Sequence, residues 1–214
     1  MSAPQRRRTA PSKPSGRMRK ADRKRQLLEH AKELFLTHGW QNTTTKMIAE
    51  SAGVSEPVLY RHFDTKHALF LEVLGEIRAA TVNRWQSEAA KLADPLAKLH
   101  AICDMYLGST REQAREFRIM HRTLVECADD VDINALLRSF YMDSETLLAE
   151  VIREGQQSGV FRRNLDPRVG AWELIRTALG HTLTLPLGIP LHQEADYIPQ
   201  AVECLLQCLL KTDV

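Results

Sequence analysis

The side chains best suited to bind another molecule lie in a short polar stretch between residues 44 and 66. It combines hydroxyl, basic and acidic groups with one apolar residue, namely Thr44, Thr45, Lys46, Ser55, Glu56, Val58, Tyr60, Arg61, His62 and Lys66. Hydroxyl and basic groups bind phosphate oxygens, whereas Arg and Glu form hydrogen bonds with the edges of bases. This combination predicts a surface that binds a polyanion such as nucleic acid.

The charge distribution along the chain supports the same prediction. Residues 1–68 carry 14 Lys and Arg against six Asp and Glu, whereas the remaining residues carry 15 against 21, which accounts for the net charge of +2. A basic N-terminal third on an acidic body is typical of a protein that meets a polyanion at one end. A solvated basic tail would explain residues 1–25 only.

The sequence gives little support for catalysis or for binding of a metal or cofactor. It contains no GxSxG, HExxH, P-loop or GxGxxG motif, and His62, His67 and His100 have no catalytic partner at a suitable spacing. The four cysteines form no CxxC pair and have no metal-spaced histidine nearby. We therefore expect no enzyme activity, no metal and no cofactor, and we interpret Cys204 and Cys208 as small apolar residues of a helix.

The sequence also predicts a cytoplasmic protein that does not enter a membrane. No apolar run approaches the roughly 18 residues of a membrane span. The basic N-terminus is not followed by the apolar segment of a signal peptide.

Helical periodicity begins after a basic arm. Residues 1–20 are rich in Pro, Ser and Arg, and cannot offset the entropy cost of ordering, so we expect them to be disordered. From residue 21 the apolar positions repeat at i, i+3, i+4 and i+7, as Leu27, Leu28, Ala31, Leu34 and Phe35. Gly39 predicts the end of this helix.

Two short helices should follow, joined by a tight turn. Thr44 is the expected N-cap of a helix over Thr45–Ala52, and Ser55 that of a helix ending near His62, with Pro57 tolerated in its first turn. The small Ala49, the turn residue Gly53 and the apolar Val54 and Leu59 occupy the positions that such a pair needs; this pattern predicts a helix-turn-helix.

The rest of the chain also has helical periodicity. We expect a helix to begin at Asp64, and helices over Leu69–Leu92, Pro95–Leu107, Arg115–Cys127, Val131–Gln157, Pro167–Leu185 and about Ala195–Leu210. The fold class is therefore all-α with about nine helices. We expect three parts: a basic arm (1–20), a three-helix DNA-binding domain (21–68) and a larger helical domain (69–214).

The segment QNTTTKMIAESAGVSEPVLYRHFDTKHALF resembles the DNA-binding domain of the TetR (tetracycline repressor) family. The matching positions are Thr44, Ile48, Ala49, Ala52, Gly53, Val54, Ser55, Leu59, Tyr60, His62, Phe63, Lys66 and Leu69. The resemblance covers about residues 22–72. His67 departs from it, because an acidic residue is common there, and Pro57 is less usual within the recognition helix.

The resemblance implies that some of these residues contact phosphates and others contact base edges. Thr44, Thr45 and Lys46 lie where a helix N-terminus binds phosphate. Tyr60 and Lys66, joined by His62, match positions that contact the DNA backbone. Ser55, Glu56, Val58 and Arg61 are the candidates for base edges. Alternatively, Ser55 and Thr44 only cap helices, Val58 packs, and the charged residues are solvated.

The last two helices are the candidates for a subunit interface. The predicted interface residues are Trp172, Ile175, Leu179, Leu183, Val202, Leu205 and Leu209. Helices this apolar need cover on two sides, and the resemblance implies a four-helix bundle in a homodimer. Burial inside a monomer is the alternative.

Aromatic and polar residues of the middle helices are candidates for a ligand pocket. They are Trp85, Tyr106, Phe117, Met120, His121, Phe140, Tyr141 and Trp172, although residues of this kind are more often ordinary core. The resemblance implies a repressor that a small, mostly apolar ligand releases from a pseudo-palindromic operator in double-stranded DNA. A ligand-dependent activator and an all-helical interaction module remain alternatives.

Overall fold

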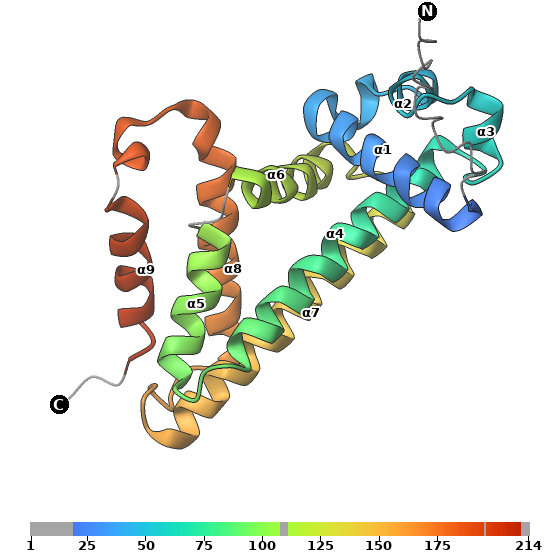
Figure 1. Cartoon of the computed structure of the whole chain (residues 1–214). Coiled ribbons are helices and arrows are strands. Elements are labelled where there is room, and N and C mark those ends of the chain that lie inside the picture. Colours follow the sequence, from blue (N-terminus) through green and yellow to red (C-terminus); the bar gives the residue numbers. More distant parts are fainter. Residues whose placement is uncertain (1–18, 108–110, 195, 211–214) are drawn as a thin grey trace, which may run out of the picture.

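The computed structural model describes residues 19–107, 111–194 and 196–210, and this part is built almost entirely of helices (Figure 1). Its α-helices are α1 (Lys20–Asn42), α2 (Thr45–Ser51), α3 (Glu56–Tyr60), α4 (Lys66–Ala89), α5 (Pro95–Leu107), α6 (Arg111–Glu126), α7 (Val131–Ser158), α8 (Pro167–Thr184) and α9 (Tyr197–Gln207). Two 3₁₀ turns, η1 (Leu185–Leu187) and η2 (Pro190–Gln193), connect α8 to α9. The all-α prediction is confirmed. The predicted basic arm lies, up to residue 18, outside the described residues.

Local sequence signals set several helix ends. Gly39 has a φ of 80° and interrupts α1, as expected of the residue type that tolerates this conformation. The Thr44 side chain accepts a hydrogen bond from the Met47 backbone N–H and so caps α2. Asp166 caps α8 through the Arg168 backbone N–H. The predicted cap at Ser55 is only positional, because its side chain makes no capping hydrogen bond.

Three helices differ from their predicted ranges by up to four residues. α4 begins at Lys66, between the predicted starts at Asp64 and Leu69, because the Thr65 side chain accepts a hydrogen bond from the Ala68 backbone N–H and caps the helix there. α6 begins four residues earlier than expected, at Arg111. α9 is shorter than expected at both ends, since η2 precedes it and it ends at Gln207.

Two long helices connect the two ends of the molecule. α1, α2 and α3 form a small head, and α4 and α7 run side by side from this head to the opposite end (Figure 1). α5, α8 and α9 form the body beside them, and α6 lies between body and head. The predicted domain boundary after residue 68 falls within α4, so that one continuous helix serves both parts.

A single apolar core runs through head and body. In the head, the Phe35 ring meets the Phe70 ring edge-on at 4.7 Å, and the Trp40 ring stacks on Phe70 at 4.6 Å. In the body, Trp85 of α4 lies against Tyr106 of α5. Because α4 contributes to both groups, burial of its apolar side chains ties the head to the body.

No helix of the described ranges is both long enough and apolar enough to cross a lipid bilayer.

Candidate nucleic-acid interface

The recognition helix α3 is held on the head by one buried side. Leu59 is fully buried, together with Ile48 and Ala49 of α2 and with Phe63 just after α3. The Val54 backbone N–H donates to the Ala49 carbonyl across the turn between the helices at 2.9 Å. These contacts fix the angle between α2 and α3 and leave the opposite side of α3 at the surface.

The surface side of α3 carries the predicted base-reading residues. Ser55 and Arg61 are exposed, while Val58 is half-buried. Tyr60 exposes 47% of its surface, which is unusual for an aromatic side chain of this size. Arg61 makes no ion pair with any described residue, so its guanidinium is free to reach an acceptor.

Glu56 is bound within the head rather than extended into solvent. Its carboxylate accepts a hydrogen bond of 2.6 Å from the Thr45 hydroxyl, and the Tyr60 hydroxyl lies 3.3 Å from the same Thr45 oxygen. The three side chains therefore join the start of α2 to both ends of the short helix α3. One carboxylate oxygen of Glu56 is occupied, which reduces its capacity to read a base.

The N-terminus of α2 is open to an anion. Thr44 is exposed and uses its hydroxyl oxygen to cap the helix, which leaves the hydroxyl proton for an acceptor outside. Lys46 is also exposed and lies only at the edge of ion-pair distance from Glu50, at 4.0 Å. A helix N-terminus with a hydroxyl and an ammonium beside it is suited to a phosphate group.

Lys66 is anchored on the end of α1. Its ammonium donates to the Trp40 carbonyl at 2.7 Å and lies 4.2 Å from the centre of the Trp40 ring, which is a cation–π contact. Burial lowers the pKa of Lys66. Sequence reasoning missed this role of Trp40; its only signal was an aromatic residue directly after the glycine that interrupts α1.

His62 faces the basic start of α1. Burial lowers its pKa, and the positive charges of Lys20, Lys24 and Arg23 lower it further, so the ring is uncharged near pH 7. Its Nδ1 atom is buried and has no hydrogen-bond partner among the described residues. The basic start of α1 thus continues the positive surface of the head past α3.

The chain matches a known family over this head. Residues 27–73 match the family described as "Bacterial regulatory proteins, tetR family". The HTH-type transcriptional repressor KstR2 of Mycolicibacterium smegmatis is 27% identical over 157 residues, which cover 73% of this chain and 75% of the relative. The chain belongs to the TetR family of transcriptional regulators. It is therefore a DNA-binding regulator, and its family relatives are regulators rather than enzymes.

Other members extend the comparison. The HTH-type transcriptional activator FasR of Mycolicibacterium smegmatis is 30% identical over 104 residues, covering 49% of this chain and 48% of the relative. A transcriptional regulator from Saccharomonospora viridis, solved in complex with choline, superposes with a TM-score of 0.80 over 90% of this chain and 100% of its own, at 22% identity. The likeness to that structure establishes the fold of this TetR family chain beyond the head.

The predicted pocket residues of the regulator divide into two groups. Trp85, Tyr106, Phe140 and Tyr141 line a common cavity in the body. The three α6 residues Phe117, Met120 and His121 are buried but do not line it. Trp172 lies outside the cavity, where its indole N–H donates to the Glu145 carboxylate at 2.7 Å.

The predicted interface residues also separate by exposure. Ile175, Val202 and Leu209 are buried in the core of the single chain, which leaves them little surface to offer a second subunit. Leu205 is half-buried and lines the body cavity. The stripe of α8 formed by Val169, Trp172, Leu179 and Leu183 remains at the surface, with Val169 and Leu183 about half exposed.

One group of potential metal ligands occurs in the described residues, although the sequence predicted none. His67 of α4, Asp130 and Asp132 bring ligand atoms within 4.8 Å of one another. The His67 ring lies 2.9 Å from the Asp130 carboxylate, and hydrogen bonds from the Ile133 backbone N–H and from His67 lower the pKa of Asp130. This contact links the first turn of α4 to the first turn of α7.

Proposed function

We propose that this regulator is a homodimeric repressor that binds a pseudo-palindromic operator and is released by a small, mostly apolar ligand. The observation that carries the proposal is the free polar side of α3, set beside the open N-terminus of α2. A helix presented in this way enters the major groove, while the neighbouring helix end binds the backbone. Since the target is chromosomal DNA, the proposal places the protein in the cytoplasm.

The proposal assigns phosphate contacts to four residues around the recognition helix. Thr44 and Lys46 bind at the start of α2, Tyr60 at the end of α3 and Lys66 at the start of α4. Two of the three Lys66 ammonium protons remain for a phosphate after the bond to the Trp40 carbonyl. These contacts fix the position of the head without reading sequence.

Sequence is read by the free side chains of α3. Arg61 is the principal candidate, because an unpaired guanidinium binds the O6 and N7 atoms of guanine in bidentate fashion. Ser55 and Val58 contribute shorter contacts. Glu56 and Thr45 are better explained as partners that hold the two helices together, and His62 as an uncharged neighbour of the phosphate path.

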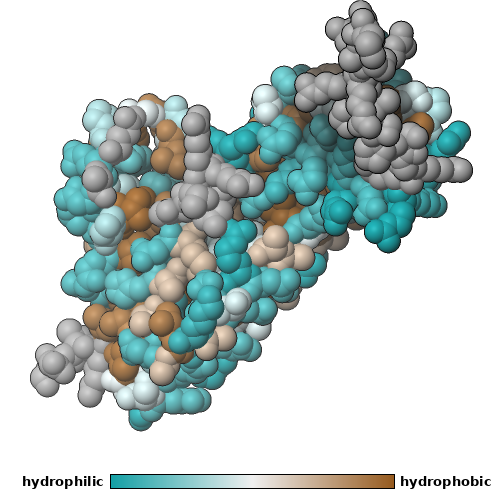
Figure 2. Space-filling view, viewed as in Figure 1, coloured by the Kyte–Doolittle hydropathy of each residue, from teal (hydrophilic) through white to brown (hydrophobic). Residues whose placement is uncertain are grey.

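The dimer is proposed to form through the exposed stripe of α8. An apolar stripe that is half exposed in the single chain is unfavourable in water, and pairing it with its own copy removes it from solvent. A twofold dimer also presents two α3 helices to successive major grooves. In Figure 2 apolar side chains interrupt the surface of the body, whereas the visible head surface is mainly hydrophilic.

Release is proposed to follow from a shift in population. A ligand that binds the body better in one arrangement of the two heads favours that arrangement. If the favoured spacing no longer matches the operator, the dimer dissociates from DNA. The relative KstR2 is named a repressor, and the Saccharomonospora viridis neighbour was solved with the small molecule choline, so repression and small-molecule binding each have a precedent in a similar protein.

A ligand-dependent activator is the second candidate. The relative FasR, which is named an activator, is 30% identical over 104 residues and so favours it. The two candidates differ in when DNA is bound: the repressor binds without ligand, whereas the activator needs its ligand.

The testing experiment measures binding of the purified protein to the DNA flanking its own gene, with competitor DNA and a salt series. A repressor with several phosphate contacts should retain this DNA selectively and lose about 1000-fold in affinity between about 50 and 200 mM salt. Equal affinity for competitor DNA, or affinity that salt does not change, contradicts the proposal and favours an interaction module.

A further inference from the structure

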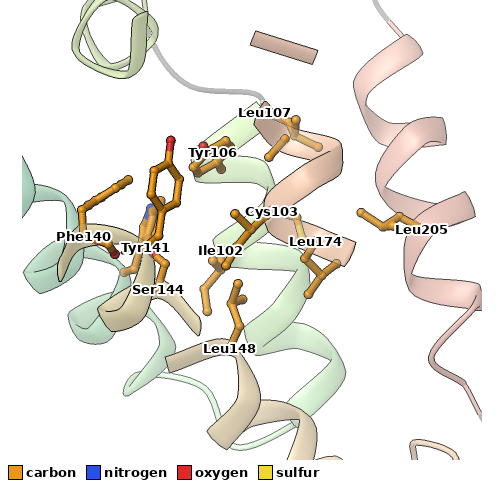
Figure 3. Close-up of a pocket in the computed structure, with 13 residues that line it drawn as sticks. Ile102, Cys103, Tyr106, Leu107, Phe140, Tyr141, Ser144, Leu148, Leu174 and Leu205 are labelled. Atoms are coloured by element: carbon orange, nitrogen blue, oxygen red, sulfur yellow. Dashed lines mark hydrogen bonds between the residues drawn. The ribbon is translucent and has the colours of Figure 1, made fainter. Parts of the chain in front are cut away.

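The body encloses a small cavity whose chemistry restricts what it can hold. It lies between α4, α5, α7 and α8, has a volume of about 20 Å³, and is closed on one side by Leu205 of α9 (Figure 3). Most of its wall is aliphatic or aromatic. In Figure 3 the hydroxyl groups of Tyr106 and Tyr141 lie at the same end of it.

Tyr141 supplies a hydrogen-bond donor that nothing in the protein uses. The side chain is 8% exposed, and its hydroxyl is buried without a partner among the described residues. Burial raises its pKa to about 12, so the proton stays on the oxygen at physiological pH. Because a buried donor without an acceptor is unfavourable, this hydroxyl indicates an acceptor that comes from outside the chain.

Tyr106 makes the same end of the cavity polar but uncharged. Its hydroxyl lies 2.8 Å from Nε2 of His121, which is 1% exposed. Burial lowers the pKa of His121 to about 4, so the pair is neutral near pH 7. The Nδ1 atom of His121 has no partner among the described residues.

The cavity wall offers no opposite charge to an ionic ligand. The Cys103 thiol lines it, and burial raises its pKa to about 12, so this group is neutral too. The buried carboxylate nearest in sequence to this wall, Glu145, is already bound by Arg168 and by the Trp172 indole. A carboxylate would lose its hydration here without a cationic partner. An ammonium is attracted by aromatic rings, but it cannot accept the hydrogen bond that the Tyr141 hydroxyl offers.

We infer that the cavity takes an uncharged, mostly apolar molecule whose oxygen, a ketone or alcohol oxygen, accepts a hydrogen bond from the Tyr141 hydroxyl. This inference rests on the proposed function, because it names the chemical class of the releasing ligand. The aliphatic wall contacts the body of the molecule, and the Tyr106–His121 pair borders its polar end.

The small volume connects binding to release. A space of about 20 Å³ holds little more than one water molecule, so a larger ligand must displace wall side chains. Leu205 is half-buried and is the lining residue contributed by α9, while its neighbours in the wall come from the packed helices α4, α5, α7 and α8. A ligand that requires this displacement has different affinities for the closed and the expanded body, which is the condition for a population shift.

The test compares three probes that each carry a ten-carbon chain and differ in their polar group: 2-decanone, decanoate and decyltrimethylammonium. Isothermal titration calorimetry of the full-length protein should show binding of 2-decanone at least tenfold tighter than that of either ion. Equal or tighter binding of decanoate or decyltrimethylammonium, or no binding of 2-decanone, overturns the inference.

Two tyrosine variants test the assigned donor. Tyr141→Phe should weaken 2-decanone binding about tenfold, the usual effect of removing one neutral hydrogen bond. Tyr197→Phe, the same change in α9 outside the cavity, should leave it unchanged. An unaffected affinity in a folded Tyr141→Phe protein contradicts the assignment, and if that variant does not fold, the ranking of the three probes on the wild type still decides.

DNA binding is measured on the same wild-type preparation. Selective DNA binding without 2-decanone binding means that the ligand class is wrong while the regulator proposal stands. Binding of 2-decanone without selective DNA binding means that the ligand class is right while the regulator proposal is wrong.

Discussion

At the scale of single residues, neighbouring side chains of the recognition helix have different roles: some hold the head together and others are free to contact DNA. Glu56 and Arg61 are five positions apart, and both were candidates for base contacts. Glu56 is held by the Thr45 hydroxyl at 2.6 Å, whereas Arg61 is exposed and unpaired. The hydrogen bond from Thr45 stabilises the Glu56 carboxylate but leaves its negative charge, so this side chain is better suited to joining α2 and α3 than to approaching phosphate.

Arg61→Ala should therefore reduce discrimination between DNA sequences more than overall affinity. Loss of one bidentate base contact is expected to lower discrimination by about 1–3 kcal/mol. Fluorescence anisotropy with operator and scrambled DNA measures the two affinities. Arg153→Ala, at the far end of α7 from the head, removes the same charge and should change neither. Equal losses on both DNAs would move Arg61 to the phosphate contacts.

His121 should make stability depend on pH. Its pKa is about 4 in the folded chain against about 6.5 when unfolded, so the unfolded chain binds more protons between these values. Stability is then fully present above pH 6.5 and falls as the pH drops toward 4. Between pH 7 and pH 5 this single group accounts for about 2 kcal/mol of the free energy of unfolding.

The measurement compares urea unfolding of wild type and His121→Gln at pH 7 and pH 5. Burial also lowers the pKa of His62 and His181, so the wild-type loss includes their contributions. The variant should lose about 2 kcal/mol less than the wild type over this interval. Identical losses would mean that His121 is not kept neutral by burial.

At the scale of elements, the end of α7 depends on a glycine for packing rather than for backbone conformation. A Cβ added to Gly155 would lie 2.0 Å from the Phe161 ring, and that ring is 1% exposed. Phe161 follows the end of α7 and pairs with Leu210 in an isolated bridge, so the ring has little room to move. The missing side chain lets the α7–α8 connection fold back onto the helix.

Gly155→Ala should accordingly destabilise the protein by about 1–3 kcal/mol, the usual cost of overpacking. Gly75→Ala is the matched control, because Gly75 lies within α4 and an added Cβ would meet nothing within 4 Å. That control should be neutral or more stable by up to about 1 kcal/mol, since Ala favours helix. Chemical denaturation measures the free energy of unfolding of the two variants. An unchanged stability of Gly155→Ala would show that the Phe161 ring can move aside.

The elements that obey local rules were predictable from the sequence. Thr44 caps α2, Asp166 and Pro167 begin α8, and Gly159 follows the end of α7, each within one turn of the chain. Such signals depend on backbone groups a few residues away, and a single sequence contains them all. The helix-turn-helix was predictable for the same reason, since its turn and its small and apolar positions are local.

Contacts between distant segments were not predictable in this way. The bond from Lys66 to the Trp40 carbonyl spans 26 residues, and the one from Thr45 to Glu56 spans 11. Periodicity shows that α9 is apolar on most of its circumference, but not which side its own chain covers. Val202 and Leu209 were therefore assigned to a second copy although they pack inside the first.

At the scale of the whole molecule, charged contacts link the head to the body. Glu116 of α6 is buried and bonds to Lys32 of α1, and it lies 3.8 Å from Arg84 of α4. A second α6 residue, Arg115, pairs with Glu33 of α1 at 3.0 Å. Since His121 of α6 also meets Tyr106 at the cavity, one helix touches both the ligand end and the DNA-binding end.

The two sides of α8 determine which surface can pair two copies of the chain. On α8 the small or apolar residues Gly170, Ala171 and Ala178 face the core, and the stripe that includes Leu179 and Leu183 faces solvent. Only the second side has surface to offer a partner. A charge placed in this stripe tests the interface without touching the core, whereas a charge at Leu209 would unfold the single chain.

Leu183→Glu should convert the dimer into monomers. In a twofold interface the new carboxylate is buried twice without a partner, so the dissociation constant should rise roughly 1000-fold, about 4 kcal/mol. Analytical ultracentrifugation measures it, with Leu92→Glu as the control, because Leu92 is 37% exposed in the connection between α4 and α5 rather than on α8. The control should remain dimeric. A dimeric Leu183→Glu protein would place the interface elsewhere, and the spacing of the two recognition helices would no longer follow from α8.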